Sequence, residues 1–350
     1  MTADERPRTL ADLQRAPDAE ATPAGRLPLK IQRRRTFDTP EFAGMTFLEV
    51  ESRSALNRVK GMPFGWSINP YRGCSHACSY CFARPTHAYL NLSPLGDFER
   101  TVVVKTNLVE VLRRELARPS WSGERVALGT NTDPYQRCEG RYRLMPGIIE
   151  ALAEARTAFS ILTKGTLITR DRAALVRAAE RVEVSAALTI GMLDRALWAE
   201  AEPGTPAPQA RLAAVRTLNG AGITTGVMLA PIMPGLNDDR EQLDALVDAA
   251  AAAGATHISP IVLHLRPGVR EVFWPWLVAH HPELVPRYEQ LYRGAQPPNP
   301  YRDAVTAFIA ERRRAAWRRH GRPTKVPART QPAHSSPPEH ERQPQQLALL

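Results

Sequence analysis

The sequence predicts an α/β fold, a partial barrel of about six βα units. Short β-branched runs alternate with segments of helical periodicity, and this alternation is typical of a parallel sheet with right-handed crossovers. Six units are too few for a closed eightfold barrel. The expected strands are residues 67–69, 126–128, 159–163, 182–189, 223–229 and 257–263. The β-branched run at residues 102–104 is expected to be an additional piece outside these units.

Helical patterns separate the expected strands. Asn107 is a candidate N-cap for the first helix, since asparagine side chains accept hydrogen bonds from free backbone N–H groups. Ligand sites in such folds lie at the C-terminal ends of the strands. Residues 74–81 directly follow the first expected strand, so they should lie on that face. The expected helices are residues 107–118, 146–156, 170–180, 209–221 and 237–253.

The chain divides into a central domain and two extensions. Residues 1–45 are polar, basic and unpatterned, and residues 321–350 are rich in proline, glutamine and serine, so both are expected to be flexible. The barrel is expected over residues 46–290, followed by a C-terminal helical segment at 291–320.

Composition constrains location and partners only broadly. The formal net charge is +10, which fits nucleic acid, an acidic electron-carrier protein or solubility alone. Arg312–Arg314 and Arg318–Arg319 flank Trp317 on the C-terminal segment; a solvated helix face and a phosphate contact both explain them. No apolar run reaches the ~20 residues needed to cross a bilayer, and we expect a cytoplasmic protein that does not enter the membrane.

Three cysteines form the most informative motif. Cys74, Cys78 and Cys81 have the spacing C-x3-C-x2-C. Iron–sulfur clusters are usually held by four cysteine thiolates. Three thiolates can hold three irons of a cubane cluster and leave the fourth iron open to a cofactor. With only four cysteines in 350 residues, a disulfide framework is excluded and metal binding is favoured.

A structural zinc site is the main alternative. The three cysteines with His76 or His87 would make a Cys3His set, which zinc accepts. The sequence contains no second C-x-x-C pair that would close a usual zinc finger, and both histidines also fit ordinary loop and helix-start positions. Tyr80, directly before the last cysteine, is unusual for a zinc knuckle.

The motif resembles the signature of the radical SAM superfamily, C-x3-C-x-aromatic-C, with Tyr80 as the aromatic residue. The similarity extends from about residue 62 to about residue 266 and matches the partial-barrel expectation. More narrowly, the chain is similar to the branch that includes spore photoproduct lyase. The segments that carry this narrower resemblance are residues 69–74, 129–136, 162–164, 202–206 and 230–238.

The resemblance implies a radical enzyme with two cofactors. A [4Fe–4S] cluster on Cys74, Cys78 and Cys81 would bind S-adenosylmethionine at its open iron and cleave it reductively. The resulting 5′-deoxyadenosyl radical would abstract hydrogen from a substrate. By analogy with the branch, a nucleic-acid lesion or modified base is the first candidate substrate. A reducing carrier such as flavodoxin or ferredoxin would deliver the electron. The competing hypothesis is a non-catalytic zinc- or cluster-stabilised protein that binds nucleic acid.

The resemblance also assigns roles to residues at other strand ends. Tyr80 would pack beside the adenine. Thr130, Thr132 and Asp133 follow the strand at 126–128, where Asp133 is a candidate partner for the methionine ammonium; an ordinary turn closed by Asp133-Pro134 is the alternative. Lys164 is a candidate for the methionine carboxylate, unless it is simply solvated.

Two further residues remain open from the sequence alone. Ser185 is a candidate partner for a ribose hydroxyl, and a small serine satisfied by backbone is equally consistent with its strand position. Cys138 is a weak candidate hydrogen-atom donor. In photoproduct lyase the cysteine directly precedes the Thr/Ser-Asp segment, where this chain has Thr130, so the departure argues against photolesion repair and Cys138 fits an ordinary free thiol.

Overall fold

The structure is a computed structural model that describes residues 30–62, 64–321 and 323. Within these residues, six parallel strands form one sheet in their sequence order, and the antiparallel strand β3 (Leu56–Arg58) adds to its first edge. The predicted partial (β/α)6 barrel is confirmed, with every expected strand present. The parallel strands are β4 (Trp66–Ile68), β7 (Val126–Leu128), β8 (Phe159–Thr163), β9 (Val184–Thr189), β10 (Thr224–Ile232) and β11 (Ile258–Val262).

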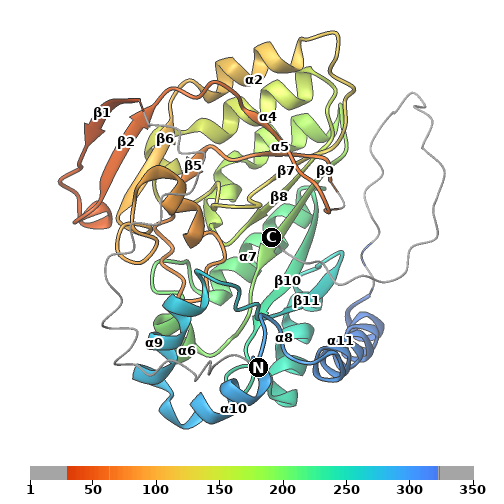
Figure 1. Cartoon of the computed structure of the whole chain (residues 1–350). Helices are drawn as coiled ribbons and strands as arrows, with labels where there is room; N and C mark the ends of the chain where they lie inside the picture. The colour runs from red at the N-terminus through yellow and green to blue at the C-terminus, as the bar shows by residue number, and fades with distance from the viewer. Residues whose placement is uncertain (1–29, 63, 322, 324–350) are drawn as a thin grey trace, which may run out of the picture.

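Helices connect successive strands and cover the outside of the sheet (Figure 1). Their buried apolar residues pack on the strands to form the main core, because each helix has one apolar face. The helices of the βα units are α2 (Leu108–Leu116), α4 (Leu144–Glu154), α5 (Arg172–Ala179), α7 (Pro208–Gly220) and α8 (Arg240–Ala252). Short additional helices are η2 (Arg84–Leu90), α3 (Glu139–Tyr142), η3 (Thr166–Asp171) and α6 (Arg195–Ala201).

A second, four-stranded sheet lies beside the barrel, at the upper left of Figure 1. It contains β2 (Thr46–Val50), β5 (Tyr71–Arg72) and β6 (Thr101–Lys105), so the additional run at 102–104 is indeed outside the six units. Its edge strand β1 (Ile31–Arg35) pairs antiparallel with β2. Residues 31–35 belong to the extension expected to be flexible, and they form a strand here because pairing with β2 overrides the polar composition. η1 (Pro40–Phe42) connects β1 and β2.

The C-terminal part completes the fold with helices packed below the barrel. Helix α11 (Asn299–His320) packs against α8 and β11. A separate small core joins α9 and α10 to the segment that contains Cys78 and Tyr80. These elements are α9 (Arg270–His280), η4 (Pro282–Leu284) and α10 (Val285–Leu291). The remaining predictions for residues 1–29 and 324–350 lie outside the described residues. No helix in the described part of the chain is long and apolar enough to span a membrane.

The expectation that the Asn107 side chain caps a helix is wrong. Asn107 precedes α2 at the N-cap position, but its side chain does not cap the helix. Its amide oxygen accepts the N–H of Ser52 at 2.8 Å, and its amide nitrogen donates to the Ser52 carbonyl at 3.1 Å. Asn107 therefore joins α2 to the segment after β2.

Candidate active site

The three cysteines lie together at the C-terminal end of the first barrel strands, as predicted. Cys74 and Cys78 are each 6% exposed and Cys81 is half-buried. All three side chains line one cavity of about 90 Å³. Gly73, directly before the loop, has a φ of +81°, and a Cβ there would lie 2.6 Å from the Thr101 carbonyl oxygen, so the turn requires glycine.

Two buried polar side chains fix this cysteine loop, residues 74–81. The Gln136 amide oxygen accepts the N–H of Ser75 at 3.0 Å, and its amide nitrogen donates to the Gly73 carbonyl at 2.9 Å. Arg84 donates from Nε and Nη2 to the Cys78 carbonyl, both at 3.3 Å. Gln136 is fully buried and Arg84 is 3% exposed, so these bonds are shielded from water.

The segment 202–206 packs directly on the cysteine loop. The Gly204 N–H donates to the His76 carbonyl at 3.1 Å, and the Ser79 N–H donates to the Ala201 carbonyl at 3.0 Å. A Cβ at Gly204 would lie only 2.0 Å from the Ser75 carbonyl oxygen. The absence of a side chain at Gly204 is therefore what allows the two backbones to approach.

The buried cysteine thiols are not set up for free reactivity. Burial raises the pKa of Cys74 well above its ordinary value and raises that of Cys78 to about 12, although nearby Lys164 lowers the latter. A thiol in such a setting ionises when a metal binds it. The hydroxyl oxygens of Ser75 and Ser79 are buried in the same loop without a hydrogen-bond partner in the described structure.

The three cysteines border a shared space of the kind that a cluster requires. Among the described residues, no group of three or more His, Cys, Asp or Glu side chains is arranged to hold one metal ion. Cysteines that each bond a different iron need a cavity between them, and Cys74, Cys78 and Cys81 share the wall of such a cavity.

The two histidines of the zinc alternative have protein contacts. His76 lines the cysteine cavity, with its Nδ1 3.4 Å from an Asp133 carboxylate oxygen. His87 is buried outside the residues that line this cavity. Its Nε2 lies 3.0 Å from the Thr101 carbonyl oxygen, and its ring contacts Phe98 with centroids 5.1 Å apart. His87 thus supports the packing behind the loop.

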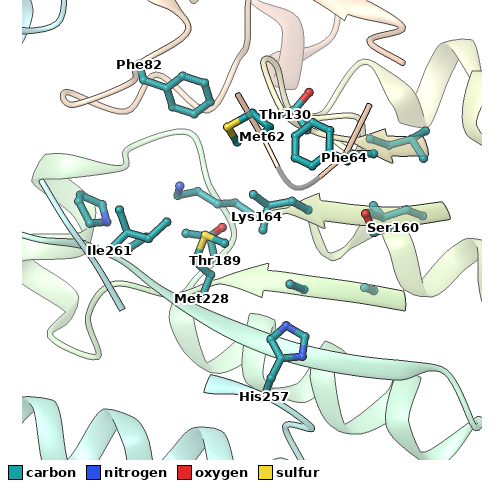
Figure 2. A pocket seen from close by; sticks show the side chains of 18 of the residues that line it. Met62, Phe64, Phe82, Thr130, Ser160, Lys164, Thr189, Met228, His257 and Ile261 are labelled. Atoms are coloured by element: carbon teal, nitrogen blue, oxygen red, sulfur yellow. The ribbon is translucent and has the colours of Figure 1, made fainter. Parts of the chain in front are cut away.

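A larger cavity of about 300 Å³ occupies the interior of the partial barrel. It adjoins the cysteine cavity, because Phe82, Leu162, Lys164 and Thr189 line both. In Figure 2 the Lys164 side chain crosses the cavity between Met62 and Phe64 on one side and Thr189 and Met228 on the other. Small residues leave this space open in the middle of the sheet, namely Ala127, Ser160, Ser185 and Ala187.

Four of the predicted site residues line this larger cavity: Tyr80, Thr130, Lys164 and Ser185. The Lys164 Nζ lies 5.4 Å from the centroid of the Tyr80 ring, within range of a cation–π contact. Burial alone would lower the pKa of Lys164, but Cys78 and Glu202 outweigh it and the net shift is upward. Lys164 therefore places a positive charge between the cysteines and the cavity.

The polar side-chain atoms of Thr132 and Asp133 form hydrogen bonds with other groups of the protein. The Thr132 hydroxyl donates to the Tyr71 carbonyl at 2.6 Å. Asp133 accepts hydrogen bonds from the Thr163 hydroxyl at 2.5 Å and from the N–H groups of Lys164 at 2.6 Å and Tyr135 at 2.8 Å. Asp133 thus joins the ends of β7 and β8 at the wall of the cysteine cavity.

Cys138 is separated from both cavities. It is fully buried in the main core and lines neither the cysteine cavity nor the larger one. Burial raises the pKa of its thiol well above the ordinary value, and the nearby charge of Glu139 raises it further. The structure does not bring Cys138 together with the other candidate site residues.

A buried charge network is the part of the site that sequence reasoning missed. Tyr80 donates its hydroxyl proton to the Glu202 carboxylate, which also pairs with Arg211; both charged side chains are 1% exposed. Arg211 further donates to the Thr189 carbonyl at 2.9 Å and to the Pro206 carbonyl at 2.7 Å. The resemblance singled out residues 202–206, yet neither Glu202 nor Gln136 received a role.

Burial alone would raise the pKa of Glu202, but Arg211 and then Lys164 outweigh it and the net shift is downward. Glu202 therefore stays ionised, which suits a group that accepts a hydrogen bond from Tyr80. The network connects the aromatic residue of the cysteine motif to β9 and α7 through one buried carboxylate.

Comparison with known proteins agrees with this architecture. The chain is 53% identical over 280 residues to an uncharacterized protein of Mycobacterium tuberculosis, covering 79% of this chain and 82% of that protein. It is 29% identical over 191 residues to an uncharacterized protein of Methanocaldococcus jannaschii, covering 55% and 69% of the two chains.

A solved structure shares the fold. Spore photoproduct lyase complexed with dinucleoside spore photoproduct superposes with a TM-score of 0.58 at 16% identity, over 79% of each chain. The family model of the Radical SAM superfamily matches residues 68–247, which include the three cysteines and, in full, the four barrel strands β7 to β10. This chain belongs to the radical SAM superfamily.

Proposed function

We propose that this protein is an enzyme that binds a [4Fe–4S] cluster through Cys74, Cys78 and Cys81 and uses it to cleave S-adenosylmethionine. The observation that carries this proposal is the adjacency of the two cavities. Three buried thiols line the smaller cavity, and Lys164 lies in the wall that both cavities share. A cofactor in the larger cavity would therefore lie next to the cysteines.

When bound, the reduced cluster and S-adenosylmethionine would supply one-electron cleavage of a C–S bond and, through it, removal of a hydrogen atom from the substrate. The protein positions the cofactors and excludes water. The Lys164 ammonium would pair with the methionine carboxylate, and the Tyr80 ring would pack beside the adenine. Thr130 and Ser185 offer hydroxyl groups along the same cavity, and Ser185 would bind the ribose.

Thr132 and Asp133 take a different role in this proposal. Their polar atoms bind the Tyr71 carbonyl, the Thr163 hydroxyl and backbone N–H groups, so we assign them to positioning the strand ends around the cofactor. Asp133 remains at the wall of the cysteine cavity, where its charge would also favour the methionine ammonium.

The proposed substrate is a nucleic-acid lesion or modified base. The larger cavity is lined mainly by apolar and aromatic side chains, including Met62, Phe64 and Phe82, which suit a flat base. The structural relative with a dinucleoside photoproduct in its title adds an analogy at the level of the fold. The proposed location is the cytoplasm, whose reducing conditions keep the cysteines free for iron.

The proposed electron donor is a reducing carrier protein such as flavodoxin or ferredoxin. The formal charge of +10 favours an acidic partner. Residues 74–81 lie near the surface on the side of Cys81, which is half-buried while Cys74 is 6% exposed.

The test is anaerobic reconstitution with iron and sulfide, followed by reduction with S-adenosylmethionine present and assay of 5′-deoxyadenosine. We expect four irons per chain and production of 5′-deoxyadenosine. Cys78→Ala should lose both the cluster and the product. Cleavage by that variant would contradict the ligand assignment. A protein that takes up only zinc and makes no 5′-deoxyadenosine would instead support a non-catalytic nucleic-acid-binding protein.

A further inference from the structure

Two cationic side chains lie next to each other on the small sheet, outside the two cavities of the active site. The antiparallel register of β5 and β6 pairs Arg72 with Val103, and Lys105 follows two residues later on β6. Residues two apart on a strand share a face, and diagonal cross-strand neighbours lie within reach of long side chains. Arg72 and Lys105 therefore occupy the same face of the sheet. They belong to the neighbouring strands β5 and β6, which are labelled in Figure 1.

No carboxylate balances these two charges in the part of the chain that the structure describes. Neither the Arg72 nor the Lys105 side chain forms an ion pair or a hydrogen bond there. Glu49 on the neighbouring strand β2 points to the opposite face, where it pairs with Arg35 at 2.5 Å. The shared face instead carries a small apolar cluster of Leu48, Val50 and Val103, covered by Leu90 and Leu92.

This setting is unfavourable for two cations without an anion. Both side chains are partly buried, so water screens their repulsion incompletely. Burial and then the charge of Arg72 lower the pKa of Lys105 to about 8. A bound anion would relieve the repulsion and restore the solvation that the apolar neighbours remove.

We propose that Arg72 and Lys105 bind a phosphate group, supplied by the phosphodiester backbone of a nucleic acid. An arginine fork gives two parallel hydrogen bonds to phosphate, and lysine adds a point charge. Tyr89, which is 60% exposed, lies close enough to Arg72 to interact with it electrostatically. A cation beside an exposed aromatic ring is the combination that binds single-stranded nucleic acid without sequence preference.

The proposed phosphate site lies next to the cysteine loop in the sequence. Only Gly73 separates Arg72 from Cys74, so a nucleic acid held here would pass beside the cysteine loop. The inference concerns binding alone and stands independently of the proposed cleavage of S-adenosylmethionine.

The experiment titrates the full-length chain by calorimetry with three probes at constant chloride: inorganic phosphate, a short single-stranded DNA, and the same DNA with neutral methylphosphonate linkages. We expect the natural DNA to bind at least tenfold more tightly than the methylphosphonate form. Lys105→Met should weaken binding of the natural DNA about tenfold, the effect of losing one hydrogen bond to a charged group. The matched control Lys60→Met removes an exposed lysine and should change binding less than twofold.

Equal affinity for the two DNA probes would overturn the proposal, as would equal effects of Lys105→Met and Lys60→Met. Inorganic phosphate that binds as tightly as the DNA and displaces it would keep the phosphate site and assign it to free phosphate. The folding control is thermal unfolding in phosphate-free buffer, where Lys105→Met should be at least as stable as the wild type because it removes the repulsion.

Discussion

The Tyr80 hydroxyl donates a hydrogen bond to the Glu202 carboxylate, which comes from a segment 122 residues further along the chain. Tyr80 belongs to the cysteine motif, and Glu202 belongs to the turn that follows α6. Because Glu202 also pairs with buried Arg211, the position of the Tyr80 ring depends on an ion pair whose two residues lie outside the cysteine motif. Several consequences of this and neighbouring contacts can be measured.

Glu202→Gln should destabilise the protein. The substitution keeps the size of the side chain but leaves the buried Arg211 guanidinium without its counter-charge, which costs about 3 kcal/mol in the free energy of unfolding. Chemical denaturation measures the loss. Glu180→Gln, on an exposed helix end, is the control and should change stability by less than about 0.5 kcal/mol. Equal stability of the two variants would show that the Arg211 pair does not stabilise the fold.

Gly204→Ala should displace the cysteine loop. Its Cβ would lie 2.0 Å from the Ser75 carbonyl oxygen; the Cβ position is fixed by the backbone and the oxygen is a backbone atom, so neither can rotate away. We expect lower iron content after reconstitution and a loss of about 2 kcal/mol or more in stability. Gly220→Ala is the matched control, because a Cβ at this position in α7 meets no atom within 4 Å. It should retain iron and gain up to about 1 kcal/mol. Full iron content in Gly204→Ala would contradict the close approach.

Cys138→Ala should leave the cluster intact. The thiol is buried in the main core and lines neither cavity, so its loss creates only a small void that costs about 1 kcal/mol. Iron content and 5′-deoxyadenosine production, compared with Cys78→Ala, provide the measurement. If Cys138→Ala lost its iron as Cys78→Ala is expected to do, the assignment of three ligands would be wrong.

Lys105 should make stability rise with pH in phosphate-free buffer. Its pKa is about 8 in the folded protein against 10.5 in the unfolded chain, so between these values the unfolded state binds more protons. Raising the pH through this window favours folding, and below pH 8 the full cost remains, about 3 kcal/mol. Denaturation of the wild type and Lys105→Met at pH 7 and pH 10 isolates this effect. A difference in stability that does not change with pH would contradict it.

The barrel could be predicted from the sequence because its strands are short apolar or β-branched runs that stand between helical patterns. Residues 126–128 are apolar throughout, and residues 159–163 carry Phe159, Ile161 and Leu162, so local composition identifies both. Strand β1 could not be found this way. Its sequence Ile-Gln-Arg-Arg-Arg has no apolar alternation, and only pairing with β2 makes it a strand.

The residues of the candidate site also fall into two groups: those whose role is visible in the sequence and those whose role is not. Cys74, Cys78 and Cys81 stand within one short motif, so their chemistry is visible in the sequence. Gln136 and Glu202 lie 61 and 122 residues from the Ser75 N–H and Tyr80 hydroxyl that they bind. A polar residue in a local pattern gives no sign that it will be buried against so distant a partner. Lys105 was missed for a related reason, because its exceptional feature arises only on folding: no carboxylate of the described residues pairs with it.

The close approach at Gly204 also limits how the cysteine motif can be transplanted. A grafted copy of residues 74–81 in another barrel would keep its three thiols but lose the backbone hydrogen bonds from Gly204 to His76 and from Ser79 to Ala201. The graft would therefore need the turn at residues 201–206 as well, at the same distance from the loop. A portable version of this site therefore contains at least two segments of chain, which are separated by more than a hundred residues, and one of them contains no cysteine.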